Sequence, residues 1–157
     1  MDLKHEIALM TDADAQNCLN GILKGWIATE EVYAEVVASK QEMTTVILTT
    51  AQELGQPLPA EIDRMPMDQT RAIRVILVAI ADDLALSPRL EAWLRTQRPK
   101  LIEPVTTALV LAGITFLLSV HVKVDYESQD GSRKLKIQVE KKPTSETIIG
   151  KFFRIFH

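Results

Sequence analysis

Residues 105–120 read VTTALVLAGITFLLSV, sixteen consecutive positions without a charged side chain. Such a uniformly apolar stretch does not suit a helix that keeps one face in water. As a helix it would be ~24 Å long at 1.5 Å per residue, whereas a bilayer core of ~30 Å needs about 20 apolar residues. Two interpretations therefore stay open: a segment inserted in a membrane, or a core helix buried in protein.

The large apolar side chains of this stretch are the ones expected to make the membrane or oligomer contact. They are Leu109, Leu111, Ile114, Phe116, Leu117 and Leu118. Residues 89–104 and residues 121–136 each carry four lysines or arginines, so the flanking charges predict no membrane orientation.

The chain before this stretch has the helical periodicity of an all-α bundle over residues 1–98. Thr11, Thr29, Asp68 and Ser87 are expected N-caps. A helix over 30–54 could be continuous or broken near Ser39. A strongly apolar helix over 69–86 is the expected centre of this domain. Gly21 and Gly25 either weaken the second helix by roughly 1 kcal/mol each or let a neighbour approach closely.

The period changes to two after the apolar stretch, which predicts a β-hairpin with one apolar face. Asp130-Gly131 is the turn signal between the two strands. The apolar side chains, an expected interface, are Val122, Val124, Tyr126, Leu135, Ile137 and Val139. A short amphipathic helix is expected after Pro143.

The predicted fold class is thus mainly α: a bundle over 1–98, a long hydrophobic helix within 99–120, and a hairpin with a final helix over 121–157.

The charge is divided along the chain, with a net charge of −6 over residues 1–120 and +3 over 121–157. The acidic body argues against nucleic acid as a partner. The three histidines lack metal-pair spacing, and no phosphate-binding glycine loop or nucleophile elbow occurs. Cys18, the single cysteine, falls on an apolar stripe as a structural thiol would. We therefore expect no catalytic residue, cofactor or metal, and a protein that is not an enzyme.

The segment Val122-Lys123-Val124-Asp125-Tyr126, the Gly131 turn and the basic run Lys134 to Ser145 follow a helical domain and an uncharged stretch. In this order the chain resembles small bacterial conflict-system proteins that carry an effector-associated domain. The resemblance covers mainly residues 105–145. It implies an antiviral or stress-response setting in which the helical domain recruits a protease or a nucleotide-activated effector, and it assigns no catalytic residue.

Two hypotheses for function follow. In the first, the chain is an adaptor or membrane-associated effector that forms a homo-oligomer through the hairpin and the apolar segment. In the second, it is a soluble ligand-binding or regulatory module with 105–120 as a buried core helix. The first residues lack the basic and apolar regions of a secretory signal, so we expect a cytoplasmic protein, associated with the inner membrane if the segment inserts.

Overall fold

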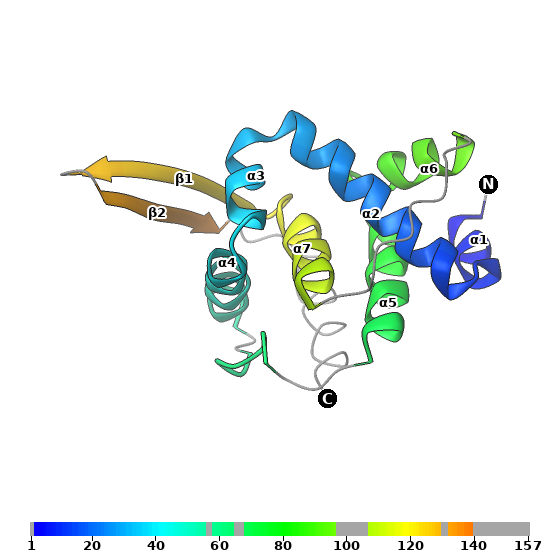
Figure 1. Cartoon of the computed structure of the whole chain (residues 1–157), viewed down its shortest axis with the longest axis horizontal. Helices are drawn as coiled ribbons and strands as arrows, with labels where there is room; N and C mark the ends of the chain where they lie inside the picture. The colour runs from blue at the N-terminus through cyan, green and yellow to red at the C-terminus, as the bar shows by residue number, and fades with distance from the viewer. Residues whose placement is uncertain (1, 56–57, 65–67, 97–106, 130–131, 140–157) are drawn as a thin grey trace.

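The computed structural model describes residues 2–55, 58–64, 68–96, 107–129 and 132–139. Seven helices and one antiparallel hairpin make up this part of the chain (Figure 1). In chain order they are α1 (Leu3–Leu9), α2 (Asp12–Thr29), α3 (Glu31–Val37), α4 (Lys40–Glu53), α5 (Gln69–Asp82), α6 (Ser87–Arg95), α7 (Thr107–Leu118), β1 (Val122–Gln129) and β2 (Ser132–Val139). The mainly helical class and the hairpin are as predicted. The expected C-terminal helix lies outside the described residues.

Helix α7 is the centre of the molecule, with α2, α4 and α5 packed around it (Figure 1). All nine residues from Val110 to Leu118 are buried. The predicted long hydrophobic helix is wrong in its length, because α7 has 12 residues within the described chain. The helix expected over 69–86 is α5, which ends at Asp82 and contacts α1, α2 and α6 as well as α7. A helix surrounded by others needs no polar face, which explains the uncharged sequence.

One hydrophobic core includes described residues on both sides of the predicted boundary between residues 98 and 99. Side chains of α7 share this core with residues of α2, α4 and α5, and Val122 and Val124 of β1 extend it. The segment that suggested a separate membrane or assembly unit is therefore the element that joins the helices before residue 98 to the hairpin.

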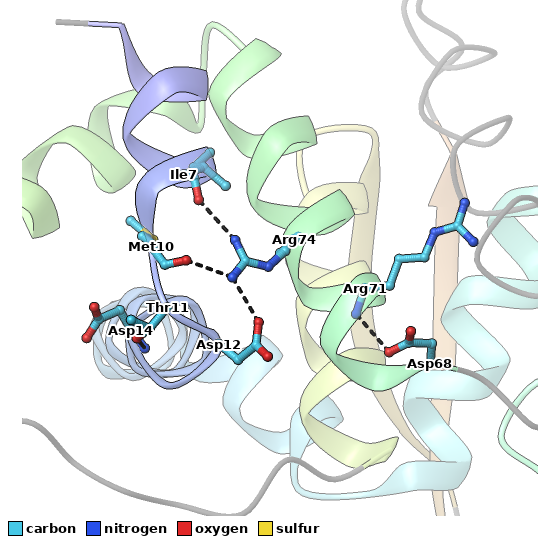
Figure 2. A network of polar contacts seen from close by, with 8 residues as sticks. All are labelled: Ile7, Met10, Thr11, Asp12, Asp14, Asp68, Arg71 and Arg74. Carbon is cyan, nitrogen blue, oxygen red and sulfur yellow. Dashed lines mark hydrogen bonds and ion pairs between the residues drawn. The ribbon is translucent and has the colours of Figure 1, made fainter.

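Side-chain caps define where several helices begin. Thr11 accepts a hydrogen bond from the Asp14 amide at 3.1 Å, and Asp68 accepts one from the Arg71 amide at 3.1 Å (Figure 2). Both residues are predicted N-caps. The caps predicted at Thr29 and Ser87 are wrong: Thr29 ends α2, where its hydroxyl donates to the Trp26 carbonyl, and Ser87 lies inside α6 as its first residue. Ser39 accepts a hydrogen bond from the Glu42 amide at 3.3 Å and caps the start of α4. The helix expected over 30–54 is therefore broken near Ser39 into α3 and α4, one of the two alternatives that the sequence left open.

The two glycines of α2 differ in their surroundings. A Cβ atom on Gly21 would lie 2.2 Å from Nε1 of Trp93, so the glycine lets α6 approach α2 closely. A Cβ atom on Gly25 would meet nothing within 4 Å. Of the two explanations offered by the sequence, close approach applies to Gly21 and helix weakening to Gly25.

Alanine at these two positions should therefore change stability in opposite directions. Gly25→Ala should raise the free energy of unfolding by up to about 1 kcal/mol, the usual gain in helix propensity. Gly21→Ala should lower it despite the same gain, because the indole of Trp93 must move. Urea unfolding followed by circular dichroism measures both. Equal stabilisation by both substitutions would show that Trp93 can move away from α2 without lowering the free energy of unfolding.

Candidate interaction surface

The described residues offer little for covalent or metal chemistry. They contain no group of three or more histidine, cysteine, aspartate or glutamate side chains placed to hold a metal ion. Cys18 is fully buried, as its apolar stripe predicted, and burial raises the pKa of its thiol to about 12. A thiol with that pKa is protonated at neutral pH and is a poor nucleophile.

A groove of about 520 Å³ lies between the first half of α4 and residues 60–64. Its polar lining carries charges of both signs. The hydroxyl of Thr44 donates to the carbonyl of Lys40 at 2.8 Å, and that of Thr45 donates to the carbonyl of Gln41 at 3.0 Å. Both hydroxyl protons are thus used within α4.

Arg74 of α5 makes a network of polar contacts with the end of α1 and the start of α2 (Figure 2). Its guanidinium donates to the carbonyls of Ile7 at 3.1 Å and Met10 at 2.7 Å, where α1 ends. It also pairs with Oδ1 of Asp12 at 2.9 Å. This arrangement satisfies carbonyls that the end of a helix leaves unpaired, so Arg74 fastens α1 to α5. Its donors are directed at protein atoms, which gives the network a structural role.

The side chains predicted for membrane or oligomer contact lie inside the protein. Leu111, Ile114, Phe116, Leu117 and Leu118 are fully buried, and Leu109 is partly buried against the same core. The structure thus shows the buried-helix alternative for this segment. None of the described helices combines the length and the apolar composition needed to cross a bilayer.

The hairpin has the predicted pairing and the predicted division into two faces. Val122 lies opposite Val139, Val124 opposite Ile137, and Tyr126 opposite Leu135, so one face is apolar over these three pairs. On the other face Lys123, Asp125 and Glu127 of β1 are exposed, as are Lys134, Lys136 and Gln138 of β2. Directly opposite residues share a face of a sheet, which is why alternating apolar and polar residues predicted this pattern.

The helical body covers the apolar face unevenly. Val122 and Val124 are 7% and 4% exposed, whereas Tyr126, Leu135, Ile137 and Val139 are only partly buried. Helix α3 contacts β1 and α4 contacts β2, and the hairpin projects beyond both (Figure 1). The structure thus brings all six predicted residues together on one face, with two of them buried against the chain's own helices.

Tyr33 of α3 holds the base of the hairpin. Its hydroxyl donates to the carbonyl of Val122 at 2.6 Å. Its ring lies 4.9 Å from the ring of Trp26, which in turn lies 5.0 Å from that of Phe116 in α7. Burial, with a contribution from the Glu30 carboxylate, raises the pKa of Tyr33 to about 12. A continuous series of aromatic contacts therefore ties the first strand to the core helix.

A second tyrosine fixes the hairpin further along. The hydroxyl of Tyr126 donates to Oε2 of Glu42 in the first turn of α4 at 2.5 Å. Tyr33 and Glu42 were not predictable as site residues, because the two bonds span 89 and 84 positions of the chain. Residues that far apart in the chain leave no pattern in the local sequence that would predict their contact. The two bonds give the hairpin a defined direction relative to the body.

Comparison with protein-family models, with curated proteins and with solved structures finds no match to this chain.

Proposed function

We propose that this chain is a non-enzymatic interaction protein in which the helical body presents the β-hairpin to another polypeptide. The observation that supports this proposal is the hairpin's position: it projects beyond the helices while Tyr33 and Tyr126 hold it in one direction. A two-stranded sheet in water has two edges with backbone groups that can pair with a further strand. The conflict-system setting is part of the proposal and rests on the resemblance in residues 105–145.

Interaction through the hairpin should depend on the backbone of its strands. We expect Ile137→Pro in the full chain to lose association, because proline removes a backbone donor from β2. Gln138→Ala is the matched control: Gln138 is exposed on the charged face, and alanine keeps the backbone donor. Sedimentation velocity measures self-association, and affinity purification from the source cells with quantitative mass spectrometry measures binding to other proteins.

A lower self-associated mass, or loss of a specifically co-purified protein, in Ile137→Pro but not in Gln138→Ala would support the proposal. Circular dichroism must show that both variants keep the helices. The same mass and the same co-purified proteins for both variants and the wild type would place the interaction elsewhere and contradict it.

A further inference from the structure

The two outer edges of the hairpin differ in what already occupies them. On β1, the Val122 carbonyl points outward, because it accepts the Tyr33 hydroxyl of α3. Residues opposite each other in an antiparallel pair alternate between those bonded to one another and those whose backbone groups face outward. The register therefore makes Leu135, Ile137 and Val139 the outward-facing residues of β2. Among the described residues, no backbone hydrogen bond joins this edge of β2 to another segment.

The side chains along β2 indicate what kind of strand would fit beside it. Lys134 and Lys136 are exposed on one face, and Leu135 and Ile137 are half-buried on the other. Lys136 lies 3.4 Å from the carboxylate of Glu127, whereas Lys134 makes no ion pair with any residue that the structure describes. The edge thus combines outward backbone groups, a partly exposed apolar face, and two lysines on the other face, where Asp125 and Glu127 lie opposite them on β1.

We propose that the outer edge of β2 binds an extended acidic strand of a partner protein, with carboxylates alternating with apolar side chains. The carboxylates would lie beside Lys134 and Lys136, and the apolar side chains would extend the face formed by Leu135 and Ile137. Main-chain hydrogen bonds to the outward groups of β2 would supply affinity, and the alternation would supply specificity. This inference rests on the proposed function and names its partner class and its edge.

In the registers centred on Leu135 and on Lys136, a second copy of β2 is a poorer occupant of the same edge. Antiparallel pairing of two β2 strands centred on Leu135 would place Lys134 of each chain opposite Lys136 of the other. Pairing centred on Lys136 would place the two copies of that lysine opposite each other. Like charges directly opposite destabilise a sheet, so charge favours an acidic strand over this self-pairing.

The test uses two short, fluorescently labelled peptides. In one, valine alternates with glutamate, and in the other, valine alternates with lysine. The full chain is titrated into each peptide. Fluorescence anisotropy should show that the glutamate peptide binds about tenfold more tightly than the lysine peptide, because two attractive cross-strand pairs replace two repulsive ones. High salt should reduce this preference. Ile137→Pro should weaken binding of the glutamate peptide, and Gln138→Ala should not.

A variant with four charge-reversing substitutions distinguishes an effect of the charge along the edge from an effect on the stability of the hairpin. Asp125→Lys, Glu127→Lys, Lys134→Glu and Lys136→Glu together keep opposite charges facing each other within the hairpin, since Asp125 pairs with Lys136 and Glu127 with Lys134. The exchanged chain should fold and prefer the lysine peptide. Binding of neither peptide by the wild type, or equal binding of both, would overturn the inference.

Self-association through the hairpin would affect the inference and the proposed function differently. Hairpin-dependent dimerisation without peptide, detected by sedimentation, would overturn the acidic-partner inference because a second copy would then hold the edge. It would leave the proposed function standing. Conversely, peptide binding that follows these charge rules in a monomeric chain would support both.

Discussion

Replacing Ile114 with aspartate should unfold the entire helical body rather than release the C-terminal part alone. Ile114 is fully buried in α7, around which α2, α4 and α5 pack. An ionised carboxylate there would have no partner, and the effective penalty for burying such a charge is several kcal/mol. Losses of that size are comparable with the typical total stability of about 5–15 kcal/mol.

Ala108→Asp is the matched control for this prediction. Ala108 is exposed in the first turn of the same helix, where a negative charge interacts favourably with the helix dipole. Circular dichroism and thermal unfolding should show near-normal helicity for Ala108→Asp and a collapse of helicity for Ile114→Asp. Retention of most helicity by Ile114→Asp would show that the helices before residue 98 fold without α7.

The second large effect is a loss of stability at alkaline pH. Burial raises the pKa of Cys18 from 9.0 to about 12, and burial assisted by Glu30 raises that of Tyr33 from 10.0 to about 12. Both groups are neutral when protonated, so above pH 9 the unfolded chain loses its protons first and becomes favoured. The contribution is complete below pH 9 and disappears as the pH approaches 12. At about 1.4 kcal/mol per pKa unit, the sum is of the order of several kcal/mol.

Urea unfolding followed by tryptophan fluorescence at intervals between pH 7 and about 11 measures this effect. The fall in stability should become shallower from pH 9 in Cys18→Ala and from pH 10 in Tyr33→Phe. Lysine deprotonation affects all three proteins alike, so the difference between their slopes isolates the two buried groups. Parallel curves for wild type and both variants would mean that neither group is shielded from water in the folded chain.

The sequence alone was sufficient for the hairpin and for two of the helix caps. The period of two and the Asp-Gly turn predicted the hairpin and its apolar face, since opposite faces of a strand alternate by geometry. The N-caps Thr11 and Asp68 were also predictable, because a cap bonds to an amide only three positions away. Gly21 and Gly25 had the same local signal, and only the indole of Trp93 distinguishes them.

The tertiary structure alone decided the place of the segment 105–120. An apolar run of this length is equally suited to lipid and to a protein core, because both environments exclude charge and neither imposes a polar face. The packing of α2, α4 and α5 around α7 settles its burial. The hydrogen bonds of Tyr33 and Tyr126 likewise depend on partners more than 80 positions away, which only the folded chain brings within reach. Local periodicity thus determined which elements form, and long-range packing determined which of their surfaces remain exposed.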